Sequence, residues 1–116
     1  MPKRTDRLDS EFRREISEIL AAIKTSEPEL TGLVSVTEVH VSPDLKTAKV
    51  YVSIYAADPA AKKRSFEIIC SKAGLVRHEL AMEMRLRTVP ALTFLLDESM
   101  EYGSKMDEIF AKLNKG

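Results

Sequence analysis

Apolar residues recur at spacings of three and four near the beginning of the chain. Between positions 6 and 24 they are Leu8, Phe12, Ile16, Ile19, Leu20 and Ile23. Such spacing places apolar side chains along one side of an α-helix. It therefore predicts an amphipathic helix over residues 6–24, and Pro28 and Gly32 then predict a loop.

The next segment has the two-residue period of a β-strand, with one irregularity. The apolar pair Val34 and Val36 is followed by the pair Val39 and Val41, which lies in the other phase. A β-bulge inserts one extra residue into a strand and so restores a shifted phase. We therefore expect a bulge at residues 37–38, with both valine pairs on one face.

A second strand follows a turn. Pro43 and Asp44 favour a tight turn, and residues 47–56 alternate without a break. The two strands predict a hairpin. Its second strand would direct Ala48, Val50, Val52, Ile54 and Ala56 to the core, and Lys49, Tyr51, Ser53 and Tyr55 to the opposite face.

The helical period returns after residue 60 and continues to Met84. Its apolar positions are Phe66, Ile69, Ala73, Val76, Leu80 and Met84. Gly74 interrupts this run without changing its phase. The segment therefore predicts two helices, or one kinked helix, that share a buried stripe.

Two shorter elements complete the pattern. Pro90 ends the helical region and favours extended geometry before it, and residues 92–97 predict a third strand with Leu92, Phe94 and Leu96 inward. A last short helix is predicted by Met106, Ile109, Phe110 and Leu113, with Ser104 and Asp107 as its capping box. The order helix, strand, strand, kinked helix pair, strand, helix predicts an α+β fold with a three-stranded sheet packed against helices.

Length and composition fit one soluble domain. The chain has 116 residues, 44% of them hydrophobic and 31% charged, which suffices for one core. No apolar run approaches the ~20 residues of a membrane helix, and the N-terminus lacks the pattern of a signal peptide. Cys70 is the only cysteine, so no intrachain disulfide is possible. We expect a cytoplasmic monomer with a single domain, 1–116, and no membrane association.

Residues typical of catalysis are scarce. His40 and His78 do not fall in a metal-binding spacing. Cys70 follows the apolar Ile69 on a predicted helix, a position more typical of a small buried side chain than of a nucleophile. No glycine-rich phosphate loop is present. We expect neither an enzyme nor a bound metal or cofactor.

Charge is balanced overall and uneven along the chain. There are 18 basic and 18 acidic residues, yet residues 62–90 contain seven basic and three acidic ones, and residues 25–61 contain two and five. A basic face could attract phosphate despite zero net charge. Glu83 and Arg87 can pair at i, i+4. Arg77 and Arg85 have no such neighbour, which leaves open whether they are solvated or bind phosphate; Tyr51 and Tyr55 could likewise stack on bases or be ordinary sheet residues.

Four segments together resemble the ribosome-binding factor A family. They are "RTDR" (4–7), "VSVTEVHVSPDLKTAKVYVS" (34–53), "AGLVRHEL" (73–80) and "MRLRTVPALTFLLDES" (84–99). The likeness extends from about Arg4 to Phe110 and so covers nearly the whole chain. Each segment alone is a weak signal, whereas their combined order and spacing are specific.

The resemblance implies a type II KH-like fold. KH domains commonly hold nucleic acid with a GxxG loop between two helices, and this family has an Ala-x-Gly kink there instead. The kink would fall at Lys72-Ala73-Gly74, with lysine where alanine is usual and with Gly74 permitting the change of backbone direction.

The resemblance also implies a function in ribosome biogenesis. Members of the family bind the free, immature small ribosomal subunit and its rRNA, assist late maturation and rRNA processing, and often matter in the cold. They are not enzymes, and other assembly factors would be further partners. The alternative is a protein-binding α+β adaptor module whose arginines contact acidic partners without touching RNA.

Phosphate contacts by lysine and arginine would supply most of the affinity for RNA. The basic residues expected at the interface come from the start of the first helix, the hairpin, and the kinked helix pair with the segment after it. They are Lys3, Arg4 and Arg7, then Lys46 and Lys49, and then Lys72, Arg77, Arg85 and Arg87.

Overall fold

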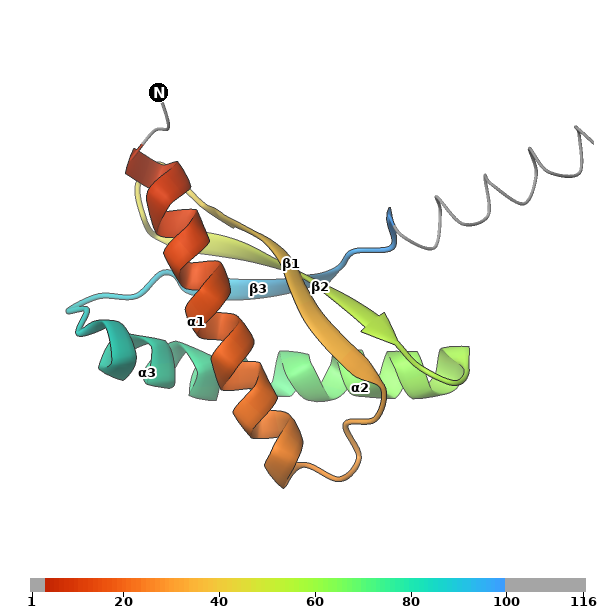
Figure 1. Ribbon diagram of the computed structural model, residues 1–116. Helices are drawn as coiled ribbons and strands as arrows, with labels where there is room; N and C mark the ends of the chain where they lie inside the picture. Colours follow the sequence, from red (N-terminus) through yellow and green to blue (C-terminus); the bar gives the residue numbers. More distant parts are fainter. Residues whose placement is uncertain (1–3, 100–116) are drawn as a thin grey trace, which may run out of the picture.

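The computed structural model describes residues 4–99, with side chains from residue 7 onward. The elements are α1 (Arg4–Ser26), β1 (Leu33–Val41), β2 (Thr47–Tyr55), α2 (Pro59–Ser71), α3 (Ala73–Met84) and β3 (Ala91–Leu96). Figure 1 shows α1 crossing the sheet, with α2 and α3 following one another beneath it. This order confirms the α+β prediction. The predicted helix near Met106 lies outside the described residues, as does Lys3.

The three strands form one mixed sheet in the order β1-β2-β3. β1 and β2 pair antiparallel, and the register shifts between Val36 and Glu38, which confirms the predicted bulge. β3 joins the other edge of β2 in parallel, with Val50 opposite Phe94. Strand β2 is therefore central, and it receives partners from both earlier and later parts of the chain.

The core lies between the helices and one face of the sheet. The alternate residues Ala48, Val50, Val52 and Ile54 of β2 are buried, together with Phe12, Ile16, Ile69, Val76 and Leu80 from the helices. Each buried Val, Leu, Ile or Phe side chain contributes about 1.5–3 kcal/mol by leaving water. The predicted apolar stripes are thus confirmed. Ser65 is also fully buried, and its hydroxyl donates a hydrogen bond to the Thr31 carbonyl at 3.0 Å.

The two helices of the predicted pair meet at Lys72, and the role expected for Gly74 was wrong. Lys72 has φ −94° and ψ 6°, which lies in the bridge region and does not require glycine. Gly74 lies inside α3 without a positive φ, and a Cβ atom there would meet nothing within 4 Å. The Lys72 ammonium lies 3.5 Å from the Glu27 carboxylate beyond the end of α1, so this lysine links the helix junction to the α1–β1 loop.

Candidate nucleic-acid interface

Helix α3 ends in a left-handed residue that begins a basic turn. Arg85 has φ 53° and ψ 45°, and its N–H bonds to the Ala81 carbonyl, as does the N–H of Leu86 at 3.0 Å. This is a common helix termination, although glycine usually occupies the left-handed position. Leu86 packs against the core, while Arg85 and Arg87 on either side of it are exposed.

The side chains of Arg85 and Arg87 form no ion pair or hydrogen bond within the described residues. The expected pairing of Glu83 with Arg87 is therefore absent from this part of the chain. Its physical reason is the end of α3 at Met84, because the i, i+4 relationship holds only along a continuing helix. Both guanidinium groups are available to an external anion.

Two hydrogen bonds bring the basic segments to one end of the molecule. The N–H of Val41 donates to Asp9 Oδ1 at 2.9 Å, which joins the β1–β2 turn to the first half of α1. The N–H of Ala91 donates to the Lys46 carbonyl at 2.9 Å, which joins the same turn to the segment following α3. Five predicted residues, all exposed, lie on these joined segments, and we call them the basic end: Arg7, Lys46, Lys49, Arg85 and Arg87.

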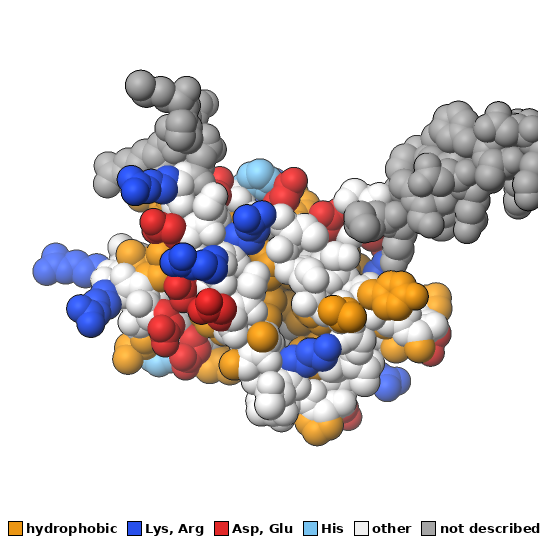
Figure 2. Space-filling model, viewed as in Figure 1, with side chains coloured by type: hydrophobic (Ala, Val, Ile, Leu, Met, Phe, Trp, Pro, Cys, Tyr) orange, Lys and Arg blue, Asp and Glu red, His pale blue; other side chains and the backbone are white. Residues whose placement is uncertain are grey.

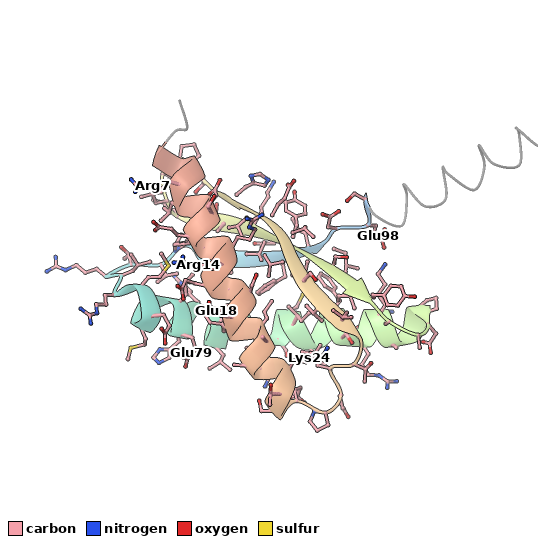
Figure 3. All side chains as sticks on the ribbon, viewed as in Figure 1. Arg7, Arg14, Glu18, Lys24, Glu79 and Glu98 are labelled. Carbon is pink, nitrogen blue, oxygen red and sulfur yellow. The ribbon has the colours of Figure 1, made fainter. Side chains whose placement is uncertain are left out.

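Figure 2 shows lysine and arginine side chains over the N-terminal half of α1 and the outer end of α3, interspersed with Asp and Glu side chains. Arg7 and Arg14 both project from that half of α1 in Figure 3. Sequence reasoning missed Arg14, although its spacing of seven from Arg7 would place both on one side of a helix. Arg14 lies 3.6 Å from Glu15 with 71% of its side chain exposed, and such surface pairs are weak.

Two other predicted residues have partners within the fold. Lys72, through Glu27, lies beyond the far end of α1, about 30 Å from Arg7 along a helix that rises about 1.5 Å per residue. Arg77 donates hydrogen bonds to the Val89 carbonyl from Nε at 3.1 Å and from Nη2 at 2.7 Å. Neither residue joins the basic end. Arg4 belongs to α1, but the structure does not describe its side chain.

The outer face of the sheet continues from Lys49 to the two tyrosines. Tyr51 is half-buried, and its ring meets that of His40 edge-on at a centroid distance of 5.8 Å. Tyr55 is 79% exposed at the far end of β2. Of the two rings, Tyr55 is thus the more open to stacking against a base.

The described residues offer little for catalysis. Among residues 4–99, no cluster of three or more His, Cys, Asp or Glu side chains could hold a metal ion. The expectation that Cys70 is buried was wrong, because Ile69 occupies the inward position and Cys70 faces outward. Partial desolvation, together with the Glu67 charge, raises the pKa of the Cys70 thiol, which disfavours the reactive thiolate.

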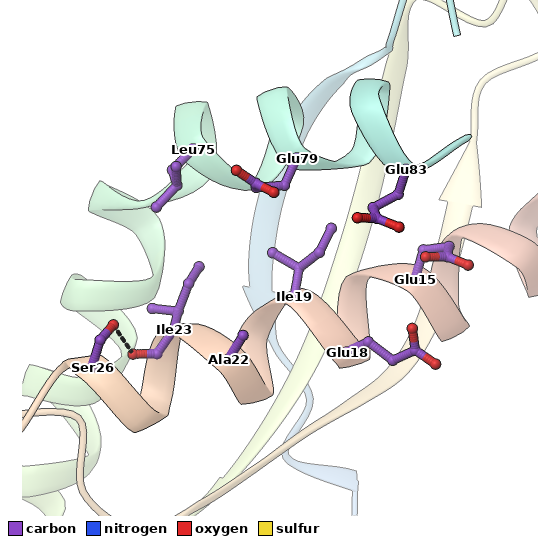
Figure 4. Close-up of a pocket in the computed structure, with 9 residues that line it drawn as sticks. All are labelled: Glu15, Glu18, Ile19, Ala22, Ile23, Ser26, Leu75, Glu79 and Glu83. Carbon is purple, nitrogen blue, oxygen red and sulfur yellow. Dashed lines mark hydrogen bonds between the residues drawn. The ribbon is translucent and has the colours of Figure 1, made fainter. Parts of the chain in front are cut away.

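A groove of about 400 Å³ lies between α1 and α3, and its charge is unsuited to RNA. Four carboxylates line it, those of Glu15, Glu18, Glu79 and Glu83 (Figure 4). Negative charge repels a phosphate backbone. The groove therefore stands apart from the basic end. No helix in the described part of the chain is long and apolar enough to cross a membrane.

Comparison with known proteins agrees with the resemblance seen in the sequence. The family model described as ribosome-binding factor A matches residues 4–110. The chain belongs to the ribosome-binding factor A family. A relative from Caldanaerobacter subterraneus subsp. tengcongensis, named ribosome-binding factor A, is 44% identical over 99% of this chain and 93% of its own. A second, from Clostridium beijerinckii, is 39% identical over 97% and 95%.

Solved structures of ribosome-binding factor A share the fold. The solution structure of a Thermotoga maritima protein is 28% identical and has a TM-score of 0.66, covering 82% of this chain and 89% of its own. A homology model of the Thermus thermophilus ribosome-binding factor A, fitted into the cryo-EM map of its 30S complex, is 25% identical with a TM-score of 0.64, covering 79% of this chain and 93% of its own. These relatives have a KH-like fold, which confirms that prediction.

Proposed function

We propose that this member of the ribosome-binding factor A family binds the immature small ribosomal subunit through its basic end. The observation that carries the proposal is the convergence of three basic segments, fixed by the Val41–Asp9 and Ala91–Lys46 hydrogen bonds. The 30S complex of the Thermus thermophilus relative supports the choice of partner.

Binding would rest on the phosphate backbone of small-subunit rRNA. An arginine guanidinium offers a planar fork that bonds two phosphate oxygens at once. Arg85 and Arg87 are exposed and have no ion-pair partner among residues 7–99, in contrast to Lys72, which pairs with Glu27. Contacts of this kind position a protein on folded RNA without reading its sequence.

The proposed role is that of a cytoplasmic, non-catalytic assembly factor. The chain would act as a monomer with one domain, 1–116, and would assist late subunit maturation and rRNA processing, with particular importance in the cold. Binding that depends on phosphate charge is released as counterions compete. Because the basic end would be occupied by rRNA, other assembly factors would bind surfaces outside it.

Sedimentation of cell lysate tests the proposal. We expect the wild-type protein to cofractionate with free small subunits at low salt and to dissociate as salt rises. The double variant Arg85→Glu/Arg87→Glu should lose this association. The matched control Lys63→Glu/Arg64→Glu makes the same charge change on the exposed surface of α2 and should retain it.

Purified components then separate direct RNA binding from binding to an acidic protein. The logarithm of the association constant for small-subunit rRNA should fall linearly with the logarithm of the salt concentration. In a variant, the magnitude of this slope should be smaller by about 0.7–0.9 for each phosphate contact removed. Protein that stays at the top of a low-salt gradient would contradict the proposal, and so would equal losses in the two double variants.

A further inference from the structure

The groove between α1 and α3 has an acidic end and an apolar end. Figure 4 shows the two helices running in opposite directions, so that Glu83 lies toward Glu15 and Leu75 lies toward Ser26. All four glutamates gather in one half. The other half is lined by Ala22, Ile23, Ser26 and Leu75.

Three of the four groove carboxylates, those of Glu18, Glu79 and Glu83, have no ion-pair partner among the described residues. No lysine or arginine lines the groove, and within the described part of the chain the four glutamates have a single ion-pair partner, Arg14, 3.6 Å from Glu15. The glutamates are not grouped closely enough to share a metal ion among the described residues. Largely uncompensated negative charge in one half of a groove favours a ligand with several positive charges.

Apolar side chains beside these carboxylates are left uncovered. Leu75 is 44% exposed and Met82 is 66% exposed. Along α3 they follow the spacing Leu75, Glu79, Met82, which places all three on one side of the helix. Exposed apolar groups next to a groove are typical of surfaces that bind another protein.

We propose that this groove binds a basic amphipathic helix from a partner protein. Lysine or arginine side chains of that helix would meet the four glutamates, and its apolar residues would cover Leu75 and the groove floor. A groove between two helices commonly receives a third helix in this way. The groove follows α1 from Glu15 to Ser26, which corresponds to about 16 Å or about 11 helical residues.

A synthetic peptide tests the proposal with the full chain. The probe is a fluorescein-labelled helix of about 14 residues made of Leu, Ala, Lys and Arg, with leucine on one face and basic residues beside it. Its control is a scrambled peptide of the same composition. Fluorescence anisotropy should show about tenfold tighter binding of the patterned peptide, because only that peptide presents its leucines together.

Charge-matched variants locate the binding. Glu18→Lys/Glu79→Lys should weaken the patterned peptide about tenfold. Glu11→Lys/Glu67→Lys makes the same change at exposed positions outside the groove and should change affinity by less than about twofold. Equal weakening by both double variants, or equal binding of both peptides, would overturn the proposal.

Peptide binding at the groove and rRNA binding at the basic end can be tested independently. Arg85→Glu/Arg87→Glu should still bind the patterned peptide with wild-type affinity or better, whereas Glu18→Lys/Glu79→Lys should still bind rRNA. Loss of peptide binding in the arginine variant would also overturn the groove assignment. If the arginine double variant loses rRNA binding while the glutamate double variant keeps it, the proposed function is supported and the result for the groove is unaffected.

Discussion

The guanidinium of Arg77 on α3 donates two hydrogen bonds to the carbonyl oxygen of Val89, at 3.1 Å from Nε and 2.7 Å from Nη2. Val89 is buried and precedes Pro90 at the entry to β3. Hydrogen bonds from a charged donor are stronger than those between neutral groups. Arg77 therefore fixes the path of the chain from α3 into the sheet.

Replacement of Arg77 by methionine should lower the free energy of unfolding by about 1–3 kcal/mol, because the Val89 carbonyl would lose its charged partner. The control is Arg87→Met, which removes an exposed arginine without a described partner and should change stability by less than about 0.5 kcal/mol. Equilibrium urea unfolding measures both. Equal stability of the two variants would show that the Arg77 hydrogen bonds contribute little.

Arg85→Gly should separate stability from RNA binding. Arg85 occupies the left-handed region at φ 53°, where glycine is favoured over residues with a Cβ atom. We expect the substitution to raise the free energy of unfolding by up to about 1 kcal/mol, while affinity for small-subunit rRNA falls. Thermal unfolding measures the change in stability, and filter binding measures the affinity for rRNA. A destabilised variant would contradict the assigned backbone role.

Substitution by alanine should have opposite effects on stability at Gly32, in the α1–β1 loop, and at Gly74, in helix α3. Gly74→Ala should stabilise the protein by about 0.4–1 kcal/mol, because Gly74 is helical and its surroundings are open. Gly32→Ala should destabilise by more than that, since Gly32 has φ +87° and a Cβ atom there would collide with the Tyr55 carbonyl. Chemical unfolding of both variants provides the comparison. Destabilisation by Gly74→Ala would restore a conformational role for this glycine.

The pKa of the Asp97 carboxyl should depend on its hydrogen bond with Thr37, which lies at the β-bulge. Hydrogen bonds from Ser99 and then from Thr37 lower the pKa of Asp97 below 3.8, and the Thr37 hydroxyl lies 2.6 Å from Asp97 Oδ2. Since the folded pKa is lowered, this contribution to stability is present above about pH 3.8 and is lost as pH falls through the folded value. Thr37→Val should raise the pKa of Asp97 in an NMR titration.

The control for that titration is Thr93→Val, which adds the same apolar group at an exposed position of β3. The stability difference between Thr37→Val and wild type should be present at neutral pH and should narrow in acid. An Asp97 pKa that is the same in both valine variants would exclude Thr37 as a cause of the lowering.

Local periods were sufficient to predict the helices and strands that the structure describes between residues 4 and 99. The bulge between Val36 and Glu38 was visible because two valine pairs lie in opposite phases, and the stripe from Phe66 to Met84 survived the helix junction. The parallel pairing of β3 with β2 was not predicted, because strand partners are chosen by packing between distant segments. Gly74 was misread for a related reason: glycine permits unusual geometry but does not require it.

The RNA-binding residues remain a prediction, and the structure gives two of them partners within the fold. Residue type and family likeness indicated the arginines, yet Arg77 bonds a backbone carbonyl and Lys72 an acid on the α1–β1 loop, and neither partner has a sequence signal. The convergence of Arg7, Lys46 and Arg85 depends on tertiary hydrogen bonds. The groove carboxylates come from two helices far apart in the chain, so only the packed structure brings them together.

The hydrogen bond from Ala91 to the Lys46 carbonyl has a consequence for protein synthesis. Helix α1 and the β1–β2 hairpin are local structures that a nascent chain can form early. The β1–β2 turn, which contains Lys46, contacts the segment after α3, which contains Arg85 and Arg87, only after Ala91 has left the ribosome and β3 has paired with β2. A partly translated chain thus lacks the assembled basic end, and under the proposed function its affinity for rRNA would arise only near the completion of its own translation.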